Sequence, residues 1–401
     1  MTDTSHGIPT AKYGASAARF DHWIRTDFVE LNTQLEELYF AQSDKANVAG
    51  VGDDLKDALR RGGHEHIVAL WREGNTDDGF DSAFGVLGNV GLYMGALRRH
   101  ELTNPDTEDR SPFPEASSLA LHIGATIGMA PRFATAHLAT HNYAVNGVRK
   151  SYTSLKDEFL FIDENTRGIL ALTEAAEALA RIVPLGVSNM VALDLFESAA
   201  KSLERAIKIN QGLFDNLDRD RFFYCVRPYY KPYRVGREVY RGANAGDFAG
   251  INQLDLLLGL TRASDPYYAQ LLVDKLLFMT PGDQAKLKDT MRYPSLLDSL
   301  LGLAGHAEAD WFKRAGAAYL KVADLFAETA RQHHDNLVKK FIVGPSDDLG
   351  DQHLQQVTAS GPPLPVLIRA LEKLRDFRTA AKRDDIETRA DDIAKLRELV
   401  S

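Results

Sequence analysis

A row of small residues that leads to a histidine is the strongest chemical signal in this sequence. Ala323, Ala327 and Ala330 recur at helical spacing, and Arg331 and His334 extend the same face. Small side chains let a flat macrocycle approach, a neutral imidazole can bind its iron, and an arginine can bind its carboxylates. A tight helix–helix contact with a histidine at its edge would give the same pattern, so both interpretations stay open at this point.

The adjacent His333 is the alternative ligand. Two neighbouring residues on a helix point about 100° apart, so only one of the two rings can face a given cavity. His333 shares a face with apolar residues, among them Val322 and Phe326, and could equally be packed and hydrogen-bonded. His334 shares the face of the alanines, and we therefore predict it as the metal ligand.

Arg227 begins a loop that is rich in aromatic residues, with Phe222 and Tyr224 just before it. An arginine can bind a carboxylate through two parallel hydrogen bonds while aromatic rings hold a flat side chain. This combination predicts a site for a substrate with both features. The alternative is that Arg227 pairs with an acid elsewhere in the chain and that the rings belong to the core.

Three further histidines, His122, His137 and His141, lie within twenty residues of one another. His137 and His141 have the i, i+4 spacing that can hold a metal ion. No acid lies between them in the manner of a zinc protease, so a polar helix edge is the favoured interpretation. A place for one of them beside a substrate remains open.

Most of the chain has the periodicity of amphipathic helices, and no set of alternating strands is evident, so we predict an all-α fold. The helices that we expect cover residues 20–40, 55–71, 81–99, 118–128, 131–142, 154–182, 192–217, 250–260, 267–279, 294–303, 311–343 and 364–382. Two stretches are irregular, 227–248 and 344–363. Loops longer than about 15 residues are often lids or binding loops, which draws attention to the second stretch.

Composition narrows the class of protein. The chain has 401 residues and a net charge of −9, which makes non-specific nucleic-acid binding an unlikely role. No apolar run reaches the ~18 residues of a membrane span, and the first residues lack the apolar core of a signal peptide. The single cysteine, Cys225, excludes an internal disulfide and any cysteine-based metal cluster. We therefore expect a cytoplasmic protein that binds neither membranes nor nucleic acid.

Several segments, taken in order, resemble the heme-dependent indoleamine/tryptophan 2,3-dioxygenase superfamily, and within it the bacterial branch of monodechloroaminopyrrolnitrin synthase. The resemblance spans roughly residues 20–385. The segments that carry it are FGVLGNVGLYMGALRRH (84–100), KSYTSLKDEF and the helix after it (150–179), FFYCVRPYYKPYRVG (222–236), YRGANAGDFAGINQLDLLLGL (240–260) and HDNLVKKFIVGP (334–345).

The resemblance implies heme b as cofactor. His334 corresponds to the family's axial iron ligand, because Pro345 follows it in the family's register. Arg331 corresponds to an arginine on the heme side that pairs with an aspartate, here Asp255. The loop over the opposite face of the heme corresponds to Asn244, Ala245 and Gly246.

The resemblance also implies a substrate site. Arg227 corresponds to the arginine that binds the carboxylate of an amino acid, and Phe222 to the aromatic residue beside it; Tyr224, two residues after Phe222 in the sequence, joins the predicted substrate-binding set. Ser360 and Gly361 lie in the counterpart of a loop that closes over substrate. His137 aligns with a histidine of the pyrrolnitrin branch, and it completes the predicted substrate-binding set.

The expected fold is a large C-terminal heme-binding helical domain with a smaller N-terminal helical region. We expect a flexible N-terminus over residues 1–19, the N-terminal region over 20–110, the catalytic region over 111–385 and a charged tail over 386–401. A homodimer is possible.

The expected function is that of a heme-dependent oxygenase in bacterial secondary metabolism. It would act on L-tryptophan or a substituted aromatic amino acid, with dioxygen or peroxide as oxidant, and would oxygenate, cleave or rearrange the ring. No side chain stands out as a certain catalytic base, and the chemistry implied by the family needs none. The alternatives are a heme-dependent tyrosine hydroxylase and a non-catalytic heme-binding sensor.

Overall fold

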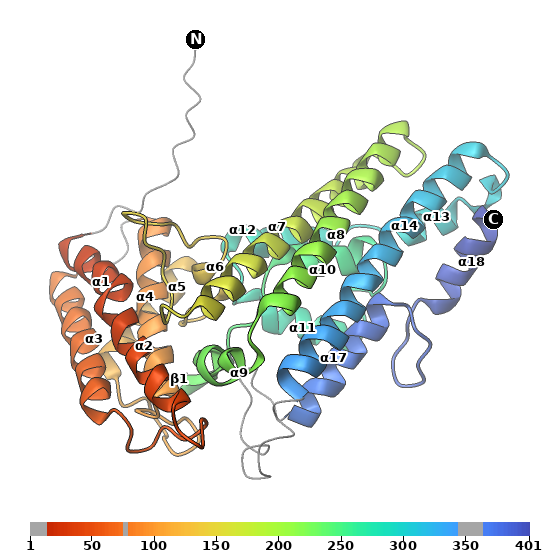
Figure 1. The fold of residues 1–401 in the computed structure, drawn as a ribbon. Helices are drawn as coiled ribbons and strands as arrows, with labels where there is room; N and C mark the ends of the chain where they lie inside the picture. Colours follow the sequence, from red (N-terminus) through yellow and green to blue (C-terminus); the bar gives the residue numbers. More distant parts are fainter. Residues whose placement is uncertain (1–13, 75–78, 344–363) are drawn as a thin grey trace. The chain divides into compact units, whose positions relative to one another are not determined.

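The computed structural model describes residues 14–74, 79–343 and 364–401, and these residues form a helical protein, as predicted (Figure 1). The chain divides into two compact units. Unit 1 comprises residues 1–158 and 224–243, and unit 2 comprises residues 159–223 and 244–401. The units are therefore divided elsewhere than at the predicted boundary after residue 110. None of the described helices combines the length and the apolar character needed to cross a membrane.

Unit 1 is built from the N-terminal helices and one hairpin. Its helices are α1 (Ala15–Arg25), α2 (Asp27–Phe40), α3 (Asp53–Glu73), α4 (Phe80–Arg99), α5 (Pro114–Ile127) and α6 (Thr135–Leu138). The aromatic loop returns to this unit through the 3-10 helix η2 (Arg227–Tyr230) and the strands β1 (Tyr233–Val235) and β2 (Glu238–Tyr240), which pair antiparallel. This short sheet was not expected from the sequence, because its strands are only three residues long.

Two buried carboxylates, each paired with cations, help to hold unit 1 together. Arg99 donates two hydrogen bonds of 2.7 Å to the carboxylate of Glu36, and the exposed fractions of these side chains are 5% and 0%. Asp21 is bound by Lys150 at 2.8 Å and by Arg25 at 2.7 Å; burial alone would raise its pKa, but the two cations together outweigh burial and lower the pKa to about 2. Breaking one partner of such a pair leaves an uncompensated charge in the interior, so these contacts fix how the helices pack.

Unit 2 is a bundle of longer helices. Its helices are α7 (Lys156–Leu185), α8 (Met190–Asn216), α9 (Arg219–Arg221), α10 (Ala249–Leu257), α11 (Pro266–Leu276), α12 (Pro281–Thr290), α13 (Leu296–Gly302), α14 (Asp310–Gln332), α17 (Leu364–Arg378) and α18 (Ala390–Val400). Three helical segments that are not α-helical complete unit 2. They are the π-helix η1 (Phe222–Val226), which continues into unit 1, the 3-10 helix η3 (Ala304–His306) and the π-helix η4 (His333–Val343).

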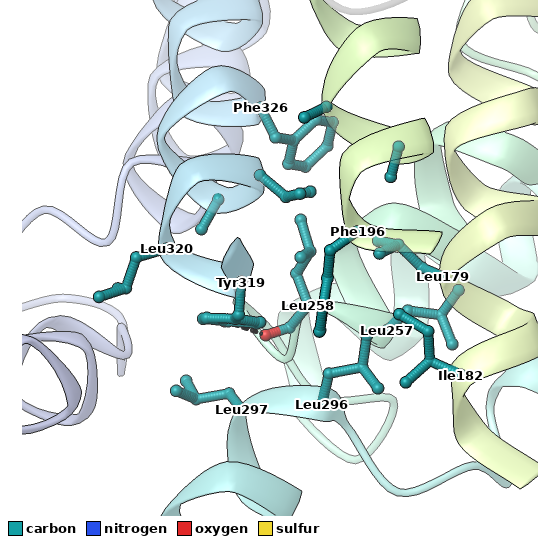
Figure 2. Close-up of a cluster of buried hydrophobic side chains, with 14 of the residues drawn as sticks. Leu179, Ile182, Phe196, Leu257, Leu258, Leu296, Leu297, Tyr319, Leu320 and Phe326 are labelled. Atoms are coloured by element: carbon teal, nitrogen blue, oxygen red, sulfur yellow. Dashed lines mark hydrogen bonds between the residues drawn. The ribbon is translucent and has the colours of Figure 1, made fainter. Parts of the chain in front are cut away.

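The core of unit 2 lies between α7, α8, α10, α13 and α14 (Figure 2). Phe196, Leu257 and Tyr319 are completely or almost completely buried there. The Tyr319 hydroxyl donates a hydrogen bond of 2.6 Å to the carbonyl of Leu258, so the ring is both packed and satisfied. Ala323 belongs to the same core, which confirms helix packing as the role of that position in the alanine row.

Four details differ from the sequence-based expectation. The helix expected over residues 20–40 is interrupted at Thr26, whose backbone leaves the helical region. The expected charged tail over 386–401 instead contains α18, which packs on α14 and buries Ile393 and Leu396. The helix expected over 311–343 is α-helical only as far as Gln332, and from His333 it continues as a π-helix. The expected flexible segment over residues 1–19 is already helical from Ala15, and its first thirteen residues lie outside the described part.

Candidate functional site

The histidine segment lies where α14 changes into the π-helix η4. In an α-helix each N–H bonds four residues back, whereas in a π-helix it bonds five residues back, so each π turn contains about one extra residue. The segment is anchored by Val338 and Phe341, which are buried. The Phe341 ring meets Phe222 edge-on at 6.1 Å, and Phe222 in turn contacts Phe161 at 4.9 Å. The predicted aromatic residue Phe222 therefore packs directly on the histidine segment.

His334 is buried among charged groups, with 5% of its side chain exposed. Its Nδ1 lies 3.2 Å from Oδ1 of Asp335 and 3.4 Å from a guanidinium nitrogen of Arg375 on α17. Lys339 donates to the same Asp335 oxygen at 2.7 Å. The Asp335 and Lys339 side chains are 50% and 60% exposed, so this cluster reaches the protein surface.

His333 has different surroundings. Its side chain is exposed, yet burial lowers its pKa to about 4, and the charges of Arg378 and Lys275 contribute to the shift. The imidazole is therefore neutral near pH 7, as a metal ligand must be.

The predicted pairing of Arg331 with Asp255 is wrong. Asp255 is 1% exposed and receives two hydrogen bonds from Arg378, of 2.8 and 2.9 Å, and a third of 2.7 Å from the hydroxyl of Tyr268. Arg331 is about half exposed and bonds to Glu328 on its own helix. The reason is geometric: Arg331 points away from the buried alanine face, while α17 brings Arg378 to the aspartate.

The position of Asp255 depends on close packing of its helix. Gly250, near the start of α10, approaches the backbone of Thr173 on α7 so closely that a Cβ atom would lie 2.8 Å from its Cα. A glycine is required wherever two backbones meet at such a distance. This contact fixes α10 against α7 and holds Asp255 within reach of α17.

The loop that was expected near the heme, Asn244 to Gly246, is a tight turn tied to α11. The Asn244 side chain accepts a hydrogen bond of 2.8 Å from the Gly246 amide, and the buried Asp247 accepts one of 3.0 Å from the Asn244 amide. Lys275 donates to the Gly246 carbonyl at 3.2 Å. Ala245, at the tip, is partly exposed. Since Lys275 also acts on His333, the loop and the histidine segment converge on the same lysine.

Arg227 lies in unit 1, at the start of η2. Arg227 is partly exposed, and burial of the rest of its side chain lowers the pKa of its guanidinium to about 10. The same desolvation, together with Arg98, Arg99 and Arg227, lowers the pKa of Lys231 to about 8. A carboxylate beside these cations would offset the cost of burying positive charge.

Tyr224, just before Arg227, is held through its backbone. Its carbonyl accepts a hydrogen bond of 2.9 Å from Arg99, the same guanidinium that binds Glu36. The Tyr224 ring lies under the ammonium group of Lys45, at 5.8 Å. The π-helix η1 that contains Tyr224 and the 3-10 helix that follows replace regular helix here, a type of distortion that is frequent at functional sites.

His137 is packed in the core of unit 1, and its place in the predicted substrate-binding set stays a prediction. Its ring stacks on Phe84 with centroids 3.8 Å apart. Nδ1 accepts from the Ala134 amide at 2.9 Å, and Nε2 lies 2.9 Å from the Phe84 carbonyl. Both ring nitrogens are thus used within the core, and burial lowers the pKa of His137 to about 3. The remaining predicted residues, Ser360 and Gly361, lie outside the described residues.

The side chains around the histidine segment suit a heme. One neutral imidazole is enough to bind its iron, and Lys275 and Arg378 bring positive charge to the side of His333, where the carboxylates of a heme need it. Within the described ranges, no three His, Cys, Asp or Glu side chains come together as a metal site. A heme needs no such group, because its macrocycle supplies the other donors and one histidine from the protein is enough.

The sequence did not reveal three residues of this site, Lys275, Arg375 and Arg378. Each is an isolated cation on an amphipathic helix, and such residues usually lie on a solvated face. Only the tertiary packing of α17 brings Arg375 and Arg378 to the histidine segment and to Asp255, and local pattern carries no such information.

Comparison with known families agrees with the resemblance read from the sequence. Residues 14–400 match the family model described as monodechloroaminopyrrolnitrin synthase PrnB, which is almost the whole chain. This family is all-α and belongs to the superfamily of indoleamine and tryptophan dioxygenase-like heme oxygenases, so the predicted fold class and the predicted heme b are confirmed. The chain is a member of the PrnB family of heme-dependent oxygenases.

Proposed function

We propose that the chain oxygenates L-tryptophan or a ring-substituted relative of it, with dioxygen as the second reactant, and that Arg227 binds the carboxylate of that substrate. The observation that carries the proposal is the desolvated guanidinium of Arg227 within an aromatic segment. When bound, heme supplies the activation of dioxygen. The chain supplies the binding and orientation of the amino acid.

The electrostatics of the segment favour an anion. Arg227 and Lys231 are cationic groups whose pKa values are lowered by burial, to about 10 and about 8. Each of them gains from a nearby carboxylate, because the carboxylate stabilises the charged form. Guanidinium also offers two parallel donors in the geometry of a carboxylate, which a lysine cannot match.

The aromatic residues favour a flat side chain on the same substrate. Tyr230 is partly exposed and packs edge-on against Phe133 at 5.8 Å and Tyr152 at 6.2 Å, next to the fully packed pair Tyr152 and Tyr229 at 4.2 Å. A rigid aromatic wall of this kind contributes contact area at little cost in side-chain entropy. An aromatic amino acid would make both contacts, since its carboxylate would lie beside the cations and its ring beside the aromatic residues.

The test compares L-tryptophan with tryptamine, which lacks the carboxylate, by calorimetric titration of the heme-loaded protein. We expect the wild type to bind L-tryptophan more tightly than tryptamine. Arg227→Lys should weaken L-tryptophan binding by roughly ten- to a hundred-fold, because a hydrogen bond to a charged group is worth about 1.5–3 kcal/mol. Tryptamine binding should change little.

The matched control is Arg219→Lys, at a residue on α9 whose side chain is 45% exposed. It should leave both affinities as they are. Equal binding of L-tryptophan and tryptamine by the wild type, or equal weakening of both by Arg227→Lys, would show that Arg227 has a structural role and would remove the basis for an amino-acid substrate.

A further inference from the structure

We propose that Tyr152 positions the aromatic side of the substrate site, and that Gly95 on α4 sets how far the Tyr152 ring can withdraw from it. Through Tyr152, helix α4 determines where the partly exposed ring of Tyr230 stands. This role rests on the proposed function, because it concerns the ring that would lie beside the side chain of an aromatic amino acid. Tyr152 and Gly95 are positioning residues, and all the residues involved belong to unit 1.

Two glycines of α4 seat the aromatic residues that contact Tyr230. A Cβ atom at Gly95 would overlap the hydroxyl oxygen of Tyr152 and would lie 3.3 Å from Cζ of the same ring. One turn earlier, a Cβ atom at Gly91 would lie 2.8 Å from Cα of Phe133. Glycine is the residue that permits such close approach to a helix. The rings of Tyr152 and Phe133 lie against Tyr230, so α4 supports Tyr230 through them.

The backbone of Tyr152 is held in place by the buried carboxyl group of Glu158. One of its oxygens accepts a hydrogen bond of 2.7 Å from the Tyr152 amide, and the other accepts bonds of 2.6 Å from the amide and the hydroxyl of Thr153. Glu158 is 0% exposed. Because these bonds fix the backbone, a push on the end of the Tyr152 side chain has to be taken up by the neighbouring rings.

The rings around Tyr152 differ in their room to move. Tyr229 stacks on it with centroids 4.2 Å apart, and the rings of Phe133 and Phe28 lie at 5.6 and 6.1 Å. These three residues are completely or almost completely buried. Tyr230, at 6.2 Å, is partly exposed. Since a close-packed core transmits strain, a displaced Tyr152 ring moves Tyr230.

Tyr230 is linked to the proposed carboxylate site by local geometry. Arg227 and Tyr230 are the first and last residues of the 3-10 helix η2. In a 3-10 helix the side chains at i and i+3 lie above one another, so these two side chains leave η2 on the same side. A substrate whose carboxylate is bound by Arg227 therefore has its ring on the side of Tyr230.

The hydroxyl of Tyr152 allows a clean test. It is buried and makes no hydrogen bond to the described residues. Tyr152→Phe therefore breaks no such bond, keeps the ring and removes the one atom that a Cβ at Gly95 would overlap. A change at Gly95 that acts through Tyr152 should be reversed by this substitution.

The experiment measures the binding of L-tryptophan and of tryptamine to the heme-loaded, full-length protein by calorimetric titration. We expect Gly95→Ala to weaken both by the same factor, roughly ten-fold, because overpacking displaces the ring that both compounds contact. Adding Tyr152→Phe should restore both affinities, since the nearest remaining ring atom lies 3.3 Å from the new Cβ. Tyr152→Phe alone should bind both compounds as the wild type does.

The matched control is Gly63→Ala on α3. A Cβ atom there would overlap the ring of Tyr93, much as one at Gly95 would overlap Tyr152. The Tyr93 ring packs on Trp23 and Phe113, which are not among the aromatic residues beside Tyr230. This variant should lose stability in thermal melting and keep both affinities.

The proposal is overturned if folded Gly95→Ala keeps its affinities, if Tyr152→Phe does not restore them, or if Gly63→Ala weakens binding equally. Should Gly95→Ala fail to fold, Tyr152→Leu replaces it, because leucine withdraws the ring: binding weaker than that of Tyr152→Phe supports the role, and equal binding overturns it. A wild type that binds tryptamine as tightly as L-tryptophan contradicts the role of Arg227 instead, and the rescue of Gly95→Ala still decides the role of Tyr152. Binding of neither compound would contradict both.

Discussion

Removing the guanidinium of Arg378 should destabilise unit 2 far more than removing that of Arg331. In Arg378→Met the Asp255 carboxylate, whose side chain is 2% exposed, loses two hydrogen bonds of 2.8 and 2.9 Å. Breaking one partner of a buried ion pair costs about 3–5 kcal/mol. Tyr268 still donates to Asp255 at 2.7 Å, and the Arg378 side chain is 13% exposed, so we expect the lower end, about 3 kcal/mol.

Differential scanning calorimetry of the heme-free protein measures this effect. For a domain of this size, 1 kcal/mol corresponds to roughly 2–4 °C, so Arg378→Met should lower the melting temperature of the affected transition by about 6–12 °C. The matched control is Arg331→Met. Its side chain is 47% exposed and bonds only to Glu328 on the same helix, so the change should stay within about 0.5 kcal/mol.

A double variant separates the ion pair from loss of packing. Adding Asp255→Leu to Arg378→Met removes the uncompensated charge, and the double variant should be more stable than the sum of the two single changes predicts. Equal melting temperatures for Arg378→Met and Arg331→Met would refute the reasoning. A larger loss in Arg331→Met would restore the pairing that the family register implies.

Three further predictions concern unit 1. Gly88→Ala would place a Cβ atom 2.5 Å from Cδ2 of the His137 ring and should cost about 1–3 kcal/mol in chemical denaturation, whereas Gly212→Ala in unit 2, where nothing lies within 4 Å, should be neutral or stabilise slightly. The pKa of His137 is about 3 in the folded chain and about 6.5 in the unfolded chain, so only the unfolded state takes up a proton as the pH falls below about 6.5. This uptake lowers the unfolding free energy by about 1.4 kcal/mol at pH 5.5, and His137→Asn should therefore reduce the slope of unfolding free energy against pH between pH 6.5 and 5.5. Arg99→Met leaves the fully buried Glu36 carboxylate without its cation and should lower the unfolding free energy by about 3–5 kcal/mol; a loss below 1 kcal/mol would contradict the buried pair.

Hydrophobic periodicity predicted the long helices well, because a core-facing stripe leaves a clear mark on the sequence. The expected helix over 154–182 is α7 (Lys156–Leu185), and the one over 81–99 is α4 (Phe80–Arg99). The change from α to π geometry at His333 was not predictable in this way. It alters the register by about one residue and leaves composition and periodicity almost unchanged.

The sequence predicts residues of the candidate site but not the side chains that contact them in the structure. The importance of the segment around His334, of Asp255 and of Arg227 followed from residue type and from the ordered resemblance. Which cation meets Asp255 did not, because Arg378 is 123 residues away in the sequence and reaches it only through tertiary packing. The surroundings of His137 were not predictable for a related reason: its i, i+4 spacing to a second histidine is visible in the sequence, while the backbone groups near both its ring nitrogens are not.

The central claim, that this chain uses heme to oxygenate an aromatic amino acid, is tested most directly by isotope transfer. The heme-loaded, reduced protein is mixed with ¹⁸O₂ and L-tryptophan, ring-substituted tryptophans or L-tyrosine, and the products are analysed by mass spectrometry. We expect a product of a tryptophan-type substrate that carries ¹⁸O, and we expect this product to be absent when the Arg227→Lys variant is used at low substrate concentration. Labelled product from tyrosine alone would move the chain to the phenol hydroxylases. No labelled product from any of these amino acids, with the heme bound and reduced, would contradict the account.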